Sequence, residues 1–253
     1  MFPILQLGPL AIQTPGLALL IGVWAGLALA EKEAARLKLN PDTIYNLALT
    51  GLVGGIIGAR LAYAARYFGI YAADPLSLFS LNPATLAPTE GALIGLTAAL
   101  VYGSRHKLPL RLTLDALTPA LAVMGMAIAA AHLASGDAFG APAHLPWGIY
   151  LWEDYRHPSQ VYELMAAVIV LGMWWRTHRR LNPGIPFWSV AAASASTWVF
   201  LEAFRGDSLI TVGGLRLAQL WGIALLGTSL AMIGVWNQKA AAPAAALENA
   251  QHD

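Results

Sequence analysis

Residues 217–236 read LAQLWGIALLGTSLAMIGVW, a stretch with no charged side chain. About 20 apolar residues in a row are enough for one helix to cross the hydrocarbon core of a bilayer. Earlier apolar stretches repeat the pattern, and the third and fifth in chain order need flanking residues to reach that length. The predicted spans are Pro15–Ala30, Leu47–Ala65, Gly91–Gly103, Leu114–Ala134, Val161–Trp175, Phe187–Phe204 and Leu217–Trp236. The sequence therefore predicts an all-α, polytopic membrane protein with about seven transmembrane helices.

The overall composition also indicates that lipid is the natural solvent of most of the chain. Of the 253 residues, 57% are hydrophobic and 11% are charged, against about 25% charged in an ordinary soluble protein. The mean hydropathy is +0.57. The formal net charge of +1 gives no sign of a nucleic-acid partner, and none is expected.

Cysteine is absent, which excludes disulfides, zinc–thiolate sites and a catalytic cysteine on this chain. The 6 histidines are spread along the sequence without the spacing of metal ligands. Neither a metal nor a cofactor is therefore expected.

Basic residues fall mainly in every second connection between the apolar stretches. Ten of the 15 Lys and Arg residues follow the first, third, fifth and last stretches. Because such an excess marks the cytoplasmic side, we expect the N-terminus outside and the C-terminus in the cytoplasm. The first ten residues carry no Lys or Arg, so the first stretch is expected to be a retained anchor. Residues 1–239 should form a single transmembrane helical domain, and 240–253 a disordered cytoplasmic tail.

Several ionisable side chains fall inside or beside the apolar stretches, where lipid makes them costly unless they are paired or functional. Arg60 follows glycines at 51, 54, 55 and 58, which allow a neighbouring helix to approach closely. One interpretation is that Arg60 pairs with a carboxylate and joins two helices. The other is that its planar guanidinium holds the phosphate of an anionic lipid.

The segment HPSQVYE, which starts at His157, leads into the fifth apolar stretch. His157 or Ser159 is expected to cap the start of the helix, and Gln160 and Glu163 share one face because they are three residues apart. This face is either a polar seam in a capped span or the wall of a polar cavity at the outer membrane face. Gln219, near the start of the last stretch, fits such a wall as well.

A second polar group lies at the end of the sixth stretch. Glu202 and Arg205 are also three residues apart, and Asp207 follows them. They form either a local ion pair or a site in which Arg205 points into a cavity and Glu202 orients it. Glu90, at the start of the third stretch, either stabilises a helix N-terminus or titrates in the cavity. His132 is either a hydrogen-bonded interior residue or a proton-transfer group.

Short segments of the chain resemble those of a known family in both content and order. They are GARLAY (58–63), EGALIG (90–95), SGDAFGAPAHLPWG (135–148), HPSQVYE (157–163), FLEAFRGD (200–207) and LRLAQLWGI (215–223). From about Gly16 to Trp236 the chain resembles the prolipoprotein diacylglyceryl transferases, and HPSQVYE is the most specific match. The resemblance implies a multi-pass protein of the bacterial inner membrane with a role in lipoprotein biosynthesis.

The resemblance also implies a reaction. In the family, the thiol of the lipobox cysteine of a prolipoprotein attacks glycerol C3 of phosphatidylglycerol, which forms a thioether and releases glycerol phosphate. The implied partners are phosphatidylglycerol or another anionic phospholipid, the prolipoprotein signal peptide and membrane lipid. Arginines in a low-dielectric cavity can stabilise the phosphate. A base must take the thiol proton, because the thiolate is the nucleophile.

This chain departs from the family at positions that the resemblance implies belong to the reaction centre. Glu90 stands where the family has a histidine, Ala129 where it has an arginine, and His132 where it has an asparagine. The candidate catalytic residues are therefore Arg205, which would bind phosphate, and Glu90 or His132, one of which would be the base. The positions expected to bind lipid are Arg60, Asp137, His157, Gln160, Glu163, Glu202, Asp207 and Gln219.

Four functional interpretations stay open at this point. The chain is an active transferase with a rearranged centre, a catalytically silent paralogue that binds phospholipid or a lipoprotein precursor, a transferase for another lipid or acceptor, or an unrelated transporter. This sequence lacks the two related halves that many transporters show, which argues against the transporter. An active centre requires Glu90, His132 and Arg205 to converge on one outward-facing cavity.

Overall fold

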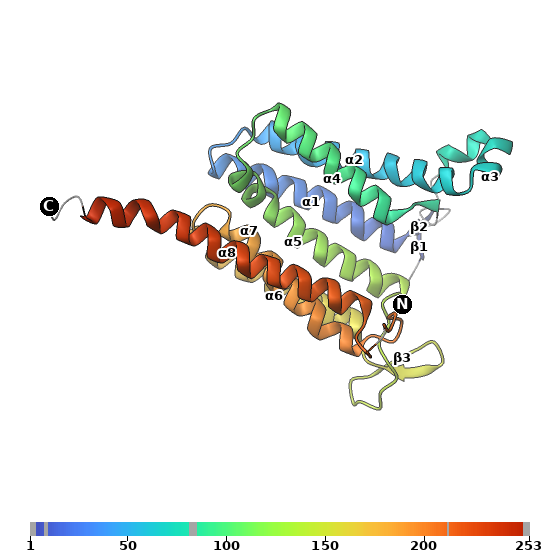
Figure 1. Ribbon diagram of the computed structural model, residues 1–253. Helices are drawn as coiled ribbons and strands as arrows, with labels where there is room; N and C mark the ends of the chain where they lie inside the picture. The colour runs from blue at the N-terminus through green and yellow to red at the C-terminus, as the bar shows by residue number, and fades with distance from the viewer. Residues whose placement is uncertain (1–3, 8–9, 81–84, 212, 250–253) are drawn as a thin grey trace. The chain divides into compact units, whose positions relative to one another are not determined.

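The computed structural model describes residues 4–7, 10–80, 85–211 and 213–249. In these ranges the chain is mainly helical, and Figure 1 shows long helices joined by turns and short hairpins. The α-helices are α1 (Thr14–Arg36), α2 (Pro41–Arg66), α3 (Phe68–Ala73), α4 (Pro88–Arg105), α5 (Leu110–Ser135), α6 (Ser159–Thr177), α7 (Ile185–Leu201) and α8 (Leu217–Asn249). The shorter elements are the 3₁₀ helices η1 (Pro75–Phe79) and η3 (Glu202–Phe204) and the strands β1 (Ile4–Leu7), β2 (Leu10–Gln13), β3 (Ile149–Leu151) and β4 (Asp154–Arg156).

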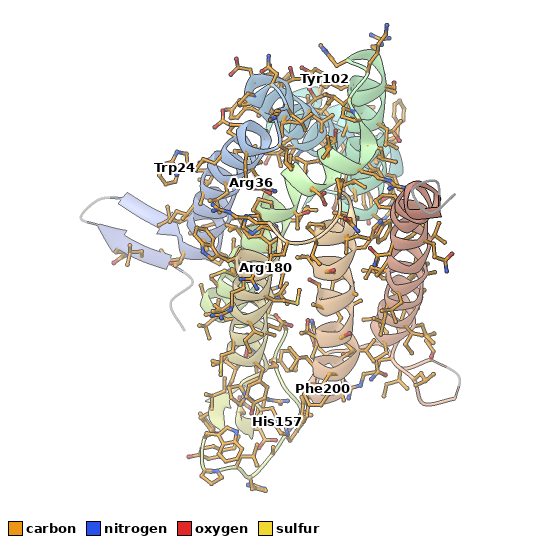
Figure 2. The ribbon with its side chains drawn as sticks, turned by 90° about the vertical axis from the view of Figure 1, so that its left-hand side faces the viewer. Trp24, Arg36, Tyr102, His157, Arg180 and Phe200 are labelled. Carbon is orange, nitrogen blue, oxygen red and sulfur yellow. The ribbon has the colours of Figure 1, made fainter. Side chains whose placement is uncertain are left out.

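Four helices are long and apolar enough to cross a membrane, namely α1, α2, α5 and the Leu217–Gln238 part of α8. Many of their large apolar side chains lie on the outside. Trp24 of α1, for example, is 74% exposed and points away from its helix in Figure 2. Exposed apolar surface on this scale is typical of contact with lipid. The prediction of a helical membrane protein is therefore confirmed, and α4, α6 and α7 occupy the three remaining predicted stretches.

Two helices extend beyond the apolar stretches that predict them. α1 continues past Ala30 to Arg36, and α8 continues past Trp236 to Asn249. Residues 240–249, which the sequence predicts to be disordered, are thus helical, in keeping with the high helix propensity of their alanines; residues 250–253 lie outside the described residues. The extension of α1 buries Glu33, whose Oε2 lies 3.8 Å from Nε2 of His178.

The chain divides into two compact units, each described here by itself. Unit 1 contains the described residues of Met1–Glu33 and Leu114–Asp253, and unit 2 is Ala34–Thr113. In unit 2, α2 and α4 lie side by side (Figure 1). Glycines allow this close approach, as the sequence predicts: a Cβ added at Gly95 would lie 2.5 Å from the backbone oxygen of Gly51.

In unit 1, α7 packs against both α6 and α8. A core cluster includes Ala122 of α5, Val170 and Trp174 of α6, and Val190 of α7. The buried carboxylate of Asp115, on α5, accepts hydrogen bonds from the backbone N–H groups of Gly184 (2.5 Å) and Phe187 (3.2 Å). These N–H groups belong to the first turn of α7, which otherwise leaves them unsatisfied. A side chain of one helix therefore caps another.

The connection from α5 to α6 contains the β3–β4 hairpin. Its two-residue loop, Trp152–Glu153, has positive φ at both positions, the conformation of a type I′ turn. Nε1 of Trp152 donates a hydrogen bond to the backbone oxygen of Gly136 (3.3 Å), at the end of α5. This contact holds the hairpin against the end of α5 and offsets part of the strain of the turn.

Candidate active site

Polar side chains from three parts of unit 1 meet around Glu163, on the second turn of α6. Oε2 of Glu163 is 2.9 Å from Nδ1 of His132, near the end of α5. Its other oxygen, Oε1, accepts a hydrogen bond from Nη1 of Arg205 (3.3 Å), which follows η3. One carboxylate thus joins an imidazole and a guanidinium that are 73 positions apart in the sequence (Arg205 minus His132). We call this group the His132–Glu163–Arg205 triad.

Two further carboxylates surround Arg205. Asp207 accepts from Nε (3.0 Å) and from Nη2 (2.8 Å), a fork that fixes the guanidinium plane. Oε2 of Glu202 lies 3.7 Å from Nε. Burial of Arg205 acts to lower its pKa, but the hydrogen bond and charge of Asp207, together with Glu202 and Glu163, outweigh burial and raise the pKa above its usual value. Arg205 is therefore a permanent cation.

The backbone around Arg205 is held by an extended segment, Phe139–Ala143. On one side, its Ala141 N–H donates to the oxygen of Phe204 (2.8 Å), and Gly206 donates to the oxygen of Phe139 (2.8 Å). On the other side, His157 donates to the oxygen of Ala141 (3.1 Å). The segment therefore fixes the residues on both sides of Arg205 relative to the start of α6.

Glycine makes these close contacts possible. A Cβ at position 140 would lie 2.2 Å from the backbone oxygen of His157, and a Cβ at position 206 would lie 2.7 Å from the backbone oxygen of Gly140. Both distances are too short for any other residue without movement of the backbone. Gly140 and Gly206 are therefore positioning residues of the site, and both lie in segments that the sequence comparison above singled out.

The start of α6 is fixed by buried polar groups rather than by a side-chain cap. Gln160, fully buried, donates through Nε2 to the backbone oxygen of Asp137 (2.9 Å), and Ser159 donates to the backbone oxygen of Ala138 (2.5 Å). Pro158 is the N-cap, and no side chain caps the helix. The expected cap by His157 or Ser159 is therefore wrong, because Ser159 is bonded to the preceding loop.

His157 contacts aromatic rings beside the triad. Its ring centroid is 5.1 Å from that of Phe204 and 6.2 Å from that of Tyr162. Its buried Nδ1 has no hydrogen-bond partner among the described residues. Figure 2 shows His157 and Phe200, which lies near the end of α7, at the same end of unit 1. Asp137 is exposed and contributes its backbone groups to this end of the unit.

Gln219 and Arg216 belong to the segment that begins α8. Oε1 of Gln219 accepts from the backbone N–H of Arg216 (3.1 Å), and its Nε2 donates to the oxygen of Val199 (3.3 Å), so both ends of the amide tie α8 to its surroundings. Nη1 of Arg216 donates to the backbone oxygen of Arg205. Arg216 was not among the predicted site residues. Its signal in the sequence was its place among the few basic residues on the predicted outer side.

Two predicted site residues, Arg60 and Glu90, lie in unit 2. Arg60 donates to the hydroxyl of Thr85 and to the backbone oxygen of Ser80. Glu90, in the first turn of α4, pairs with Arg66 of α2, and its side chain is 38% exposed. Its convergence with His132 and Arg205 stays a prediction, since those two residues belong to unit 1.

The triad places a hydrogen-bonded imidazole beside a guanidinium, so a proton acceptor and a cation share one carboxylate. A carboxylate oxygen can only accept, so the Nδ1 atom of His132 carries the proton of the hydrogen bond, and Nε2 of the neutral imidazole keeps its lone pair. Arg205 has five N–H donors, of which three bond to Asp207 and Glu163 in the described structure. Among the described residues, no three His, Asp or Glu side chains form a group that could hold a metal ion.

Comparison of the sequence with known proteins identifies a family. The family model described as prolipoprotein diacylglyceryl transferase matches residues 3–235. The chain is similar to three proteins named phosphatidylglycerol–prolipoprotein diacylglyceryl transferase. The one from Synechocystis sp. is 32% identical over 88% of this chain and 86% of its own length. The one from Gloeobacter violaceus is 30% identical over 92% and 91%, and the one from Synechococcus elongatus 29% over 92% and 86%.

The match runs through both units and includes every segment that carries the triad. This chain belongs to the prolipoprotein diacylglyceryl transferase family.

Proposed function

We propose that this chain transfers the diacylglyceryl group of phosphatidylglycerol to the cysteine thiol of a prolipoprotein. Membership of the family and the names of the similar proteins support the substrates. The triad supports the chemistry, and it is the observation on which the proposal depends. One carboxylate holds both a candidate base and a candidate phosphate-binding cation in contact.

In the proposed reaction, His132 is the base. Nε2 takes the proton of the thiol, the sulfur forms a bond to glycerol C3, and the bond from C3 to the phosphate oxygen breaks. The electron pair of that bond leaves with glycerol phosphate. Glu163 orients the imidazole through Nδ1 and stabilises the imidazolium that forms, the role that a carboxylate plays behind a catalytic histidine. Glu90 is the less suitable base, because its carboxylate is paired with Arg66 and partly exposed.

Arg205 binds the phosphate that leaves. Asp207 fixes its plane, and the two N–H donors beyond the three bonds described above remain available to bind the anion. Three carboxylates around one guanidinium would repel a phosphate, so a second cation is needed. Arg216, bonded to the backbone oxygen of Arg205, supplies it.

The remaining assignments follow the family. Residues 1–239 form one transmembrane domain with seven spans, followed by a cytoplasmic tail, and the N-terminus and the triad face the outside of the bacterial inner membrane. Lipid enters at the level of the headgroups, where an anionic phospholipid meets Arg205. Asp137, His157, Gln160, Glu202, Asp207 and Gln219 shape or line the lipid site in unit 1, and Arg60, in unit 2, is a further candidate for lipid binding.

The test uses membranes from bacteria depleted of their own transferase. The chain is expressed together with a prolipoprotein, and phosphatidylglycerol carrying a radiolabel in its diacylglyceryl group is supplied. We expect label in the precursor, and little label when Arg205→Gln replaces the wild-type chain. Bound phosphatidylglycerol without labelled precursor would refute the proposal and favour a silent paralogue that only binds lipid.

A further inference from the structure

A hollow of about 510 Å³ opens at the far end of α6 from the triad. It is lined by Arg176 and Thr177, in the last turn of the helix, and by Arg180 and Leu181, which follow it. Arg176 is 13 positions beyond Glu163, which is about 20 Å along a helix at 1.5 Å per residue. Figure 2 shows His157 and Arg180 at opposite ends of this part of unit 1. The hollow is thus separate from the triad.

Two arginine side chains supply its charge. Arg176 and Arg180 are both exposed, and within the described part of the chain neither forms an ion pair with a carboxylate. Two carboxylates lie near this end of α6, Glu33 beside buried His178 and Asp115 bonded to the N–H of Gly184, and neither lines the hollow. Both guanidinium groups line the same hollow, and an anion bound between them would offset the repulsion of their like charges. Unpaired guanidinium groups at one hollow therefore indicate an anionic ligand.

The geometry of arginine suits an oxyanion such as phosphate. The planar guanidinium presents N–H pairs that match two oxygens of one phosphate, and two arginines can hold one phosphate from two sides. The hydroxyl of Thr177 donates to the backbone oxygen of Met173 (2.8 Å), so its hydrogen is already used. The two arginines therefore provide the donors of this site.

The apolar surroundings favour a lipid as the carrier of the phosphate. Leu181 lines the hollow and is 37% exposed, and the indole of Trp175, one position before Arg176, is 65% exposed. Tryptophan next to basic residues at the end of a hydrophobic helix is typical of the membrane interface. A free phosphate would not contact these apolar side chains favourably, whereas the acyl chains of a lipid can pack against them.

We propose that this hollow binds the phosphate headgroup of an anionic phospholipid at the membrane face opposite to the triad. The site rests on the proposed topology, in which α6 crosses the membrane, but not on transferase activity, because none of its residues belongs to the triad or its supports. It holds the end of α6 at the headgroup level of the second leaflet.

The test locates the lipid by cross-linking. The full chain is reconstituted in nanodiscs that contain phosphatidylcholine and a phosphatidylglycerol probe with a photoactivatable headgroup, and labelled peptides are mapped by mass spectrometry. We expect label in the segment 171–184. Arg176→Gln and Arg180→Gln should each weaken it about tenfold or more, since each removes charge-assisted hydrogen bonds to the phosphate.

Arg179→Gln is the matched control. Arg179 lies in the same basic segment and its loss changes the charge equally, but it does not line the hollow. We expect it to keep at least half of the label. Equal losses in the three variants would overturn the site and leave only a general attraction of basic residues to anionic lipid. Competition by glycerol 3-phosphate as effective as competition by unlabelled phosphatidylglycerol would overturn the assignment to a lipid.

Discussion

Glu163→Gln perturbs the centre of the triad without a change of size. The carboxylate contacts Nδ1 of His132 at 2.9 Å and Nη1 of Arg205 at 3.3 Å. An amide keeps one accepting oxygen, and the charge of Arg205 attracts it, so the NH₂ group is left facing His132. The imidazole must then accept at Nδ1 and carry its proton on Nε2, where the reaction needs a lone pair.

The expected loss follows from that tautomer. A positioned general base contributes about 10²–10⁴ to a rate, and the wrong histidine tautomer costs about 10⁴ in a serine protease. We therefore expect kcat to fall by about 10²–10⁴. KM for phosphatidylglycerol should change far less, because Asp207 still holds Arg205. The assay measures initial rates of diacylglyceryl transfer from labelled phosphatidylglycerol to a precursor peptide by the purified full chain.

Glu202→Gln is the control for charge. It removes a carboxylate 3.7 Å from Arg205 that makes no contact with His132 among the described residues. Because it leaves the imidazole in place, we expect a loss of about tenfold or less. Equal losses of kcat in the two variants would refute the reasoning, since the rate would then follow the negative charge around Arg205 rather than the tautomer of His132.

Three further predictions concern the cation and the packing. Arg205→Lys keeps a charge but cannot form the fork with Asp207, and we expect kcat/KM to fall by about 10²–10³. The raised pKa of Arg205 lies far above the working range, and the stabilisation by its charge is lost only as pH rises through that pKa. The loss of activity in Arg205→Lys should therefore be constant from about pH 6 to 9. A loss of activity that appears only at the alkaline end would contradict the role of guanidinium geometry. Asp115→Ala removes the acceptor for Gly184 and Phe187, and we expect the free energy of unfolding to fall by about 1–3 kcal/mol. The loss should appear as a lower thermal midpoint in detergent. An unchanged midpoint would show that α7 does not need this cap. Gly95→Ala should destabilise the chain by about 1–3 kcal/mol through the clash with Gly51, while Gly125→Ala, which meets no atom within 4 Å, should leave the midpoint unchanged or slightly raised; equal effects of both would argue against close packing of α2 and α4.

Periodicity and hydropathy predict the helices well, because each lipid-facing helix must be long and apolar by itself. The stretch at Leu114–Ala134 became α5, and the run of glycines before Arg60 became the surface that meets α4. Spacing also predicted that Glu202 and Arg205 lie close, at 3.7 Å. Such local relations are readable because helix geometry alone fixes them.

Contacts between distant segments could not be read in the same way. Asp115 caps a helix that starts 70 positions later (Ile185 minus Asp115). Glu163 contacts His132 and Arg205 because helix packing brings the three residues together. Arg216 contacts a backbone carbonyl, which carries no sequence signal of its own. The family resemblance singled out positions 132, 163 and 205, but only the fold brings them into contact.

The most direct test of the proposed reaction centre compares two variants in the transfer assay, His132→Asn and Glu90→Gln. Asparagine keeps a hydrogen bond to Glu163 but has no basic nitrogen, whereas Glu90→Gln removes only the carboxylate paired with Arg66. We expect His132→Asn to lose the transfer of label from phosphatidylglycerol to the precursor and Glu90→Gln to retain it. Transfer that survives in His132→Asn and disappears in Glu90→Gln would contradict the account and make Glu90 the base.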